Sequence, residues 1–198
     1  MTHSEALTPM GEYVGEAKRN EHARYIKGLV DFVNIIDYIK PKRILDCGYG
    51  GGMSHAIWLT AWSDCEVYCI TPEERGMFDW ETGAVGMDAI GDMPISAQSR
   101  FHFARGAMQD IDSIWPDKSE GYFDMVFIDT EHTYDAQIMQ CEVGLKSLRS
   151  GGVISGHDYE RRSVKESTDN TLHRVGNVYP EYIVLPDGTQ IFYCVKGE

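Results

Sequence analysis

Acidic and imidazole side chains follow two apolar segments of the chain that have the composition of buried strands. Asp129 ends one segment and precedes His132 by three positions, and the adjacent His157 and Asp158 follow the other segment. The carboxyl ends of neighbouring parallel strands open into one crevice, so we expect these side chains to converge there. Two carboxylates and an imidazole repel or desolvate one another unless a cation lies between them. Oxygen ligands favour Mg²⁺ or Mn²⁺, and an imidazole shifts the preference toward Mn²⁺, iron or zinc.

A glycine-rich segment supplies a second candidate ligand site. Residues 46–54 read D-C-G-Y-G-G-G-M-S, between a strand candidate and helical text. Glycines at alternate positions let the backbone turn sharply and approach a ligand closely, and the helix start offers free N–H groups to that ligand. Dinucleotides and S-adenosylmethionine are both bound by such loops. The pattern D-x-G-x-G-x-G departs from the dinucleotide pattern G-x-G-x-x-G. A tight turn without a ligand is the alternative.

The hydrophobic pattern predicts the sheet that must position these residues. Five apolar runs alternate with helical text: 43–47, 66–70, 101–104, 125–129 and 153–155. Runs that are apolar on both faces and separated by helices predict a parallel sheet covered on both sides. The runs 182–185 and 190–195 then predict a β-hairpin with its turn at Asp187-Gly188. The hairpin makes the sheet mixed, with one antiparallel strand.

The same pattern predicts the helices and the domain organisation. Apolar residues at three- and four-residue steps indicate helices over 12–39, 55–61 and 134–148, and Pro41 ends the first. We expect one helix and a loop in 72–99, and a loop in 159–180. A chain of 198 residues can form one core. We therefore expect a single domain, 1–198, with an N-terminal helical cap over 1–40 and a core over 41–198.

Charge and cysteine content restrict the partners and the compartment. The 18 Lys and Arg against 31 Asp and Glu give a net charge of −13, which argues against a nucleic-acid or anionic-membrane surface. No apolar run approaches the roughly 18 residues of a membrane span, and the first residues lack a signal pattern. Five cysteines, an odd number, predict reduced, buried thiols. We expect a cytoplasmic protein with a small-molecule partner. A homo-oligomer is compatible with the sequence.

Four motifs together resemble a known family. D-x-G-x-G-x-G at 46–52, G-A-x-Q-D at 106–110, D-x-x-H-x-Y at 129–134 and H-D-Y at 157–159 resemble class I S-adenosylmethionine-dependent methyltransferases. The closest similarity is to the branch of metal-assisted small-molecule O-methyltransferases. The resemblance implies an α/β, Rossmann-like three-layer fold with seven strands in the order 3-2-1-4-5-7-6. It also implies methyl transfer to a hydroxyl of a small polar or sugar-like acceptor.

The resemblance assigns roles to individual residues. Asp129, His157 and Asp158 would bind the divalent metal, and His132 would act with Asp129 in catalysis as the general base. The residues implied to contact S-adenosylmethionine are Asp46, Gly48, Tyr49, Gly50, Gly52, Ser54, Thr71, Glu73, Ala107, Met108, Gln109 and Asp129. The acid that usually binds the ribose at the end of the second strand is missing, and Glu73 is a hypothetical substitute.

Several alternatives stay open at the level of sequence. His132 is a base, a metal ligand, or a cap of the helix that starts near Thr133. Tyr13 and Tyr25 of the N-terminal helix are candidates for ligand contact, and the sequence does not decide between them. A metal-dependent hydrolase or oxygenase would use Asp129, His132 and His157 as a two-histidine, one-carboxylate iron site. A nucleoside-binding relative without catalytic activity would explain the missing ribose acid.

Overall fold

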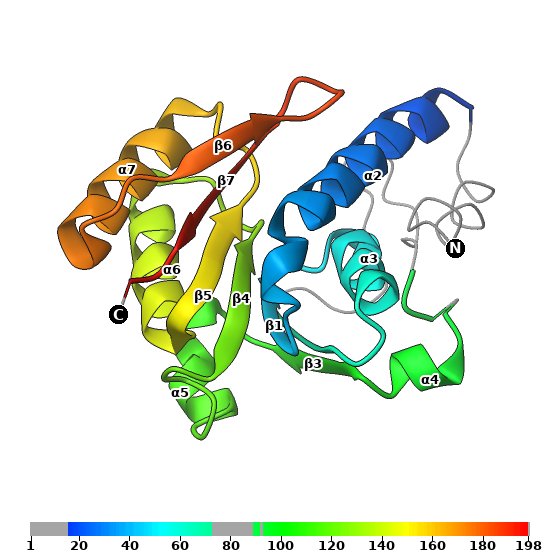
Figure 1. Ribbon diagram of the computed structural model, residues 1–198, viewed down its shortest axis with the longest axis horizontal. Coiled ribbons are helices and arrows are strands. Elements are labelled where there is room, and N and C mark those ends of the chain that lie inside the picture. The colour runs from blue at the N-terminus through cyan, green and yellow to red at the C-terminus, as the bar shows by residue number, and fades with distance from the viewer. Residues whose placement is uncertain (1–15, 73–88, 92, 198) are drawn as a thin grey trace.

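The central feature of the fold is one seven-stranded sheet with the order β3-β2-β1-β4-β5-β7-β6, as predicted. The structure, a computed structural model, describes residues 16–72, 89–91 and 93–197 (Figure 1). The strands are β1 Arg43–Cys47, β2 Glu66–Thr71, β3 Phe101–Arg105, β4 Phe123–Ile128, β5 Leu148–Gly156, β6 Glu181–Val184 and β7 Gln190–Val195. Strand β7 pairs antiparallel with both β5 and β6, and the other neighbours are parallel, so the predicted antiparallel C-terminal strand is confirmed.

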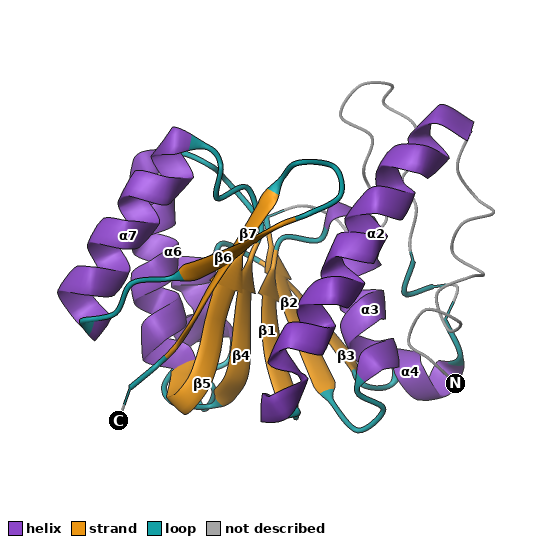
Figure 2. Cartoon of the chain, turned by 45° about the horizontal axis from the view of Figure 1, so that its top comes forward, coloured by secondary structure: helices purple, strands orange, loops and turns teal. Residues whose placement is uncertain are grey.

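Helices cover both faces of the sheet and make three layers (Figures 1 and 2). The helices of four or more residues are α2 Glu16–Ile36, α3 Met53–Ala61, α4 Ile95–Gln98, α5 Ile111–Ile114, α6 Tyr134–Ser147 and α7 Arg162–Gly176. Residues of α2 and α3 share one buried cluster with Ile44 and Phe127, and residues of α6 and α7 share another with Leu45 and Val126. Successive strand residues therefore point to opposite layers, which is why these strands are apolar throughout.

Two helices end earlier than predicted. Helix α2 ends at Ile36, because a 3₁₀ turn, Asp37–Ile39, follows it and Lys40 adopts a left-handed φ of 40°. Helix α6 ends at Ser147, because β5 begins at the next residue, Leu148.

The prediction of a loop over 159–180 is wrong, because helix α7 occupies most of that range. Three of the residues on its buried face carry hydroxyl groups, and the full buried set is Val164, Ser167, Thr168, Thr171 and Leu172. Their spacing is helical, but a stripe of hydroxyl residues gives a weak hydrophobic signal.

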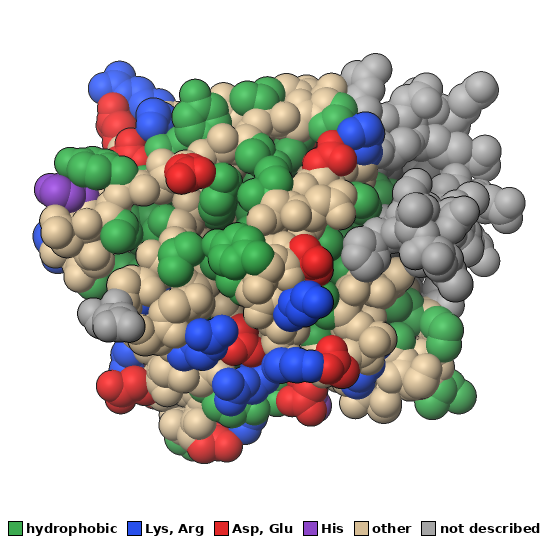
Figure 3. Space-filling model, in the orientation of Figure 1, with side chains coloured by type: hydrophobic (Ala, Val, Ile, Leu, Met, Phe, Trp, Pro, Cys, Tyr) green, Lys and Arg blue, Asp and Glu red, His purple; other side chains and the backbone are tan. Residues whose placement is uncertain are grey.

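All five cysteines are buried and free, as predicted from their odd number. Among the described residues, no helix combines the length and hydrophobicity of a membrane span. Charged side chains gather at the lower edge of the face shown in Figure 3, and hydrophobic side chains are frequent above them.

Close contact between two loops fixes the middle of the sheet. Strands β1 and β4 are parallel neighbours, and the Asp129 amide donates to the Cys47 carbonyl at 3.0 Å. Gly48 follows at a φ of +99°, where an added Cβ would lie 2.0 Å from the Asp129 carbonyl oxygen. Only glycine combines this backbone conformation with such an approach. The glycine-rich loop and the loop after β4 are therefore in direct backbone contact.

Replacing Gly48 with alanine should destabilise the protein strongly. We expect G48A to lose about 2–5 kcal/mol, the sum of left-handed backbone strain and overpacking. Gly121 is a matched control, because it has a φ of +61° and open space around an added Cβ. G121A should lose only about 1–2 kcal/mol. Urea unfolding of both variants measures the difference, and equal losses would contradict the proposed backbone contact.

Candidate active site

The acidic and imidazole residues meet at the carboxyl ends of β4 and β5. Asp129 follows β4, and His157 and Asp158 follow β5. The His157 amide donates to the Ile128 carbonyl at 3.0 Å, which holds the two loops side by side. The β6–β7 connection and α2 lie around the same end of the sheet (Figure 2). The loops that carry the predicted side chains therefore lie side by side.

Asp129, His132 and Asp158 form the tightest group. One potential ligand atom from each lies within 4.8 Å of the others, a grouping that could hold a metal ion. The Nε2 atom of His132 lies 2.8 Å from Oδ2 of Asp158 and 3.9 Å from Oδ1 of Asp129. His132 thus lies between the two carboxylates. It does not cap α6, because the Thr133 hydroxyl accepts from the Ala136 amide in that role.

Charge compensation in this group shifts the pKa values in opposite directions. The carboxylates of Asp129 and Asp158 raise the pKa of His132 to about 9. Burial acts to raise the pKa of Asp158, but the imidazoles of His132 and His157 outweigh it and lower that pKa far below its usual range. Without a metal, His132 is therefore a cation at neutral pH. Its positive charge lies beside both carboxylates and compensates them.

His157 is held on both sides of its ring. Its Nδ1 lies 3.2 Å from Oδ2 of Asp158, and its Nε2 lies 3.1 Å from the Thr189 hydroxyl. Asp158 has a left-handed φ of 57°, and its Oδ1 accepts from Nε of Arg161 at 2.9 Å. A non-glycine residue in this conformation needs support from its surroundings. Arg161 and the two imidazoles supply it.

Tyr25 brings helix α2 into the site. Its hydroxyl donates to Oδ2 of Asp129 at 3.1 Å, and its ring packs edge-on against His157 with centroids 5.2 Å apart. Burial, followed by the charge of Asp129, raises the pKa of this tyrosine, so the hydroxyl stays protonated as a donor. Helix α2 therefore closes one side of the cluster formed by Asp129, His132 and Asp158.

The glycine-rich loop leaves a buried carboxylate incompletely paired. Oδ2 of Asp46 accepts from Ser54 Oγ and Trp58 Nε1, both at 2.7 Å, whereas Oδ1 is buried without a hydrogen-bond partner. Burial raises the pKa of Asp46 to about 8 and lowers that of the neighbouring His55 to about 3. An orphaned acceptor in a loop of this kind is a position where a positively charged ligand group would be stabilised.

Comparison with known proteins decides the family. The model of the methyltransferase domain family matches residues 45–159, which is more than half of the chain and includes both loops. The chain belongs to the methyltransferase domain family. No curated protein matches the chain.

Solved structures share the fold of this methyltransferase domain. A candidate caffeoyl-CoA O-methyltransferase from Staphylococcus aureus has a TM-score of 0.61 and 18% identity to this chain. The similarity covers 98% of this chain and 91% of the Staphylococcus aureus protein. An O-methyltransferase from Bacillus cereus in complex with SAH has a TM-score of 0.58 and 17% identity, covering 99% and 91%. A candidate O-methyltransferase from Nostoc punctiforme has a TM-score of 0.61 and 12% identity. That similarity covers 83% of this chain, which spans only 54% of the Nostoc protein.

The other residues predicted to contact the cofactor differ in how much space surrounds them. An added Cβ at Gly50 would meet nothing within 4 Å, whereas at Gly52 it would meet the Tyr49 hydroxyl at 2.8 Å. Tyr49 itself is 2% exposed and packs against Phe103. Thr71, at the end of β2, is buried. Gly50 is thus the position where a ligand has room to approach the loop.

The segment after β3 fits the adenine role only in part. Met108 is 4% exposed and belongs to the core with Leu145, so it packs as a core residue. Gln109 is exposed, and the Ala107 amide is bound by the Asp110 carboxylate at 2.9 Å. Glu73, the hypothetical ribose acid, lies outside the described residues.

Three functional neighbours were not identified from the sequence of the methyltransferase domain. Trp58 binds Asp46, Arg161 binds Asp158, and Thr189 binds His157. Arg161 lies three residues after Asp158, a spacing that could have suggested the pair. Trp58 and Thr189 are distant from their partners in sequence, and no motif indicates the contacts.

The metal-free protein should lose stability when His132 is replaced, and the loss should depend on pH. The folded state raises the pKa of His132 from 6.5 to about 9, so its contribution is complete below pH 6.5 and disappears as the pH rises through about 9. We expect His132→Gln to cost about 1 kcal/mol at the acidic end, as for a partly exposed ion pair. Urea unfolding in EDTA across this range measures the effect. A loss that is constant with pH would contradict the ion pair.

Proposed function

We propose that the chain is an S-adenosylmethionine-dependent O-methyltransferase assisted by a divalent cation, Mg²⁺ or Mn²⁺. Its acceptor is a hydroxyl of a small polar or sugar-like molecule. The observation that carries the proposal is the contact of Gly48 with the Asp129 backbone. That contact sets a loop suited to the cofactor directly beside carboxylates suited to the acceptor. The SAH bound to the Bacillus cereus structure, the product of methyl donation, supports the choice of cofactor.

The glycine-rich loop fits the amino-acid part of the cofactor. The unpaired Oδ1 of Asp46 is an acceptor for its ammonium group, and the space at Gly50 admits close approach of the ligand to the backbone. Helix α3 starts after the loop and directs its free N–H groups toward bound carboxylate. The Ser54 hydroxyl is already donated to Asp46, so its part is to orient that acid.

The cluster of side chains at the ends of β4 and β5 fits a divalent cation. Asp129 and Asp158 supply charged oxygen ligands, and His157 supplies an imidazole nitrogen, a set that suits Mn²⁺ or Mg²⁺. A bound cation would lower the pKa of the acceptor hydroxyl and hold its oxygen in place. The family match favours this reading over a hydrolase, an oxygenase or a non-catalytic relative.

His132 supplies the base in this proposal. Its Nε2 lies beside Asp158 and Asp129, and a bound cation would lower the pKa of the imidazole, so that it could accept the acceptor proton. Tyr25 and Asp158 restrict the movement of the acceptor from two sides, because reaction requires its oxygen, the methyl carbon and the sulfur to lie in line. The methyl group of the sulfonium needs no further activation.

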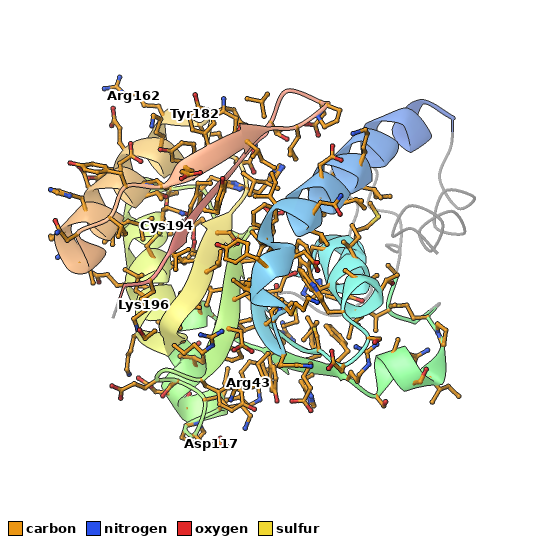
Figure 4. All side chains as sticks on the ribbon, viewed as in Figure 1. Arg43, Asp117, Arg162, Tyr182, Cys194 and Lys196 are labelled. Carbon is orange, nitrogen blue, oxygen red and sulfur yellow. The ribbon has the colours of Figure 1, made fainter. Side chains whose placement is uncertain are left out.

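Binding of S-adenosylmethionine should depend on Asp46. A bound ammonium group would lower the pKa of Asp46 from about 8 and pair with the ionised carboxylate. Asp46→Asn removes that carboxylate, and we expect affinity to fall about 10–100-fold, as for a charge-assisted hydrogen bond. Asp124→Asn is the matched control. Asp124 is also a buried carboxylate, but it pairs with Arg43, which lies with Asp117 at the lower edge of the protein in Figure 4. Calorimetry should show unchanged affinity for D124N. Equal effects, or no binding by the wild type, would overturn the cofactor assignment.

Methyl transfer should depend on the cation, whereas cofactor binding should not. Removing metal with EDTA is expected to abolish transfer and leave S-adenosylmethionine affinity unchanged. Asp129→Asn should weaken Mn²⁺ binding by more than about tenfold. Replacing a residue that only supports a metal ligand already costs about that much, so replacing a ligand should cost more. Glu131→Gln is the control, because Glu131 is an exposed acid in the same loop.

The same measurements separate the two roles open to His132. If His132 is the base, His132→Gln should lower kcat and leave Mn²⁺ affinity unchanged. Electron paramagnetic resonance measures that affinity. Loss of Mn²⁺ affinity in H132Q would instead make His132 a ligand.

A further inference from the structure

Arg161, beside the cluster at the ends of β4 and β5, is hydrogen-bonded along only one edge of its guanidinium group. Its Nε donates to Oδ1 of Asp158 at 2.9 Å. Its Nη1 and Nη2 have no hydrogen-bond partner among the residues that the structure describes, and 54% of the side chain is exposed. A guanidinium group presents its donors as a planar fork that matches two oxygens of a carboxylate or a phosphate. The edge formed by Nη1 and Nη2 is therefore available to a ligand.

The acids closest to Arg161 in sequence are bound to other groups. Arg162 projects outward from the start of α7 (Figure 4) and pairs with Glu166 at 2.7 Å. The Glu160 carboxylate accepts from the Gln190 amide at 2.8 Å. The first turn of α7 contains no acidic residue. Within the described part of the chain, Arg161 thus has a single ion-pair partner, the carboxylate of the site itself.

Hydrogen bonds on both sides hold Arg161 beside His132. The Ser163 hydroxyl donates to the His132 backbone carbonyl at 2.7 Å, which joins the start of α7 to the loop after β4. Oδ2 of Asp158 lies 2.8 Å from Nε2 of His132, while Oδ1 accepts from Arg161. The imidazole and the guanidinium group therefore lie at the two oxygens of one carboxylate. A small molecule whose hydroxyl reaches His132 can place a substituent at the free edge of Arg161.

A bound divalent cation would leave the charge of Arg161 unbalanced. Asp129 and Asp158, the two acids of the cluster, match the two charges of such a cation. The guanidinium group stays positive at all relevant pH values, so one positive charge is left over. The surplus does not depend on His132, because protonation of its imidazole only adds to it. An anionic group at this position would restore the balance, as complementary charges do in binding sites.

We propose that the acceptor carries an anionic group, a carboxylate or a phosphate, and that Arg161 binds this group through Nη1 and Nη2. Arg161 is then a specificity-determining residue, which selects hydroxylated acids over neutral molecules of similar shape. The inference rests on the proposed function for the reacting hydroxyl, whereas the anion site consists of residues of this chain alone.

The first test follows an anion on the metal-free protein. Inorganic phosphate is added in EDTA at constant ionic strength, and nitrogen-15 NMR follows the arginine Nε–H signals, which are assigned from their loss in Arg161→Gln and Arg162→Gln. We expect a saturable shift of the Arg161 signal and none for Arg162. The shift should persist in His132→Gln, which removes the nearest other cation. Absence of saturation in the wild type, or its loss in H132Q, would overturn the proposal.

The second test compares acceptors that share hydroxyl groups and differ in charge. Glucose, glucuronate and glucose 6-phosphate are offered with S-adenosylmethionine and Mn²⁺. In the wild type, kcat/KM for at least one of the two anionic sugars should exceed that for glucose by about 5–10-fold, mainly through KM. This range lies between an exposed ion pair and a charged hydrogen bond. The sugar that is preferred distinguishes a carboxylate from a phosphate.

The ratio between anionic and neutral sugars separates binding by Arg161 from mere support of Asp158. R161Q should bring the ratio close to one, because it removes the donors for the anion, whereas R162Q should keep the ratio of the wild type. An equal loss for all three sugars in R161Q, with the ratio unchanged, would make Arg161 only a support of Asp158. Equal values for the three sugars in the wild type would also overturn the inference.

Failure of the proposed function has a different signature. If none of the sugars is methylated while phosphate still saturates the Arg161 signal, the assignment of a sugar-like acceptor is wrong and the anion site stands.

Discussion

The site depends on a backbone contact that only glycine permits. Gly48 approaches the Asp129 carbonyl so closely that a single methyl group would overlap it. The contact exists because β1 and β4 are parallel neighbours that end at the same level. Two loops whose contacting residues, Gly48 and Asp129, are 81 positions apart in the chain are thereby held against each other. One has the free N–H groups and orphaned acid suited to a charged ligand, and the other has the carboxylates suited to a cation.

Charge balance is the second constraint on the site. Asp158 is surrounded by His132, His157 and Arg161, all within 3.2 Å, while Asp129 is bound by the neutral Tyr25 hydroxyl. The two acids are thus in different environments. Burying carboxylates is costly unless they are paired, and the imidazoles supply the pairing without a metal. A cation that entered the site would take over this pairing and release His132.

The sequence was sufficient to predict the strands and the residues at their ends. The alternation of apolar runs with helices predicted a parallel sheet, with Asp129 and Asp158 at the ends of its strands, and the family resemblance implied the strand order that is observed. Helix α7 was missed because its buried face is rich in hydroxyl groups rather than hydrocarbon. Met108 was assigned to a ligand although it packs in the core, since an apolar side chain after a strand suits both environments equally.

Contacts between distant segments could not be predicted, and they complete the site. Tyr25 and Asp129 are 104 positions apart, and His157 and Thr189 are 32 apart. These contacts come from the first described helix and the last hairpin, which are brought together by the sheet between them. Closing such long loops costs entropy that local patterns do not reveal. The central strands therefore place the carboxylates, and the two peripheral elements, α2 and the β6–β7 hairpin, determine how those carboxylates and His157 are oriented.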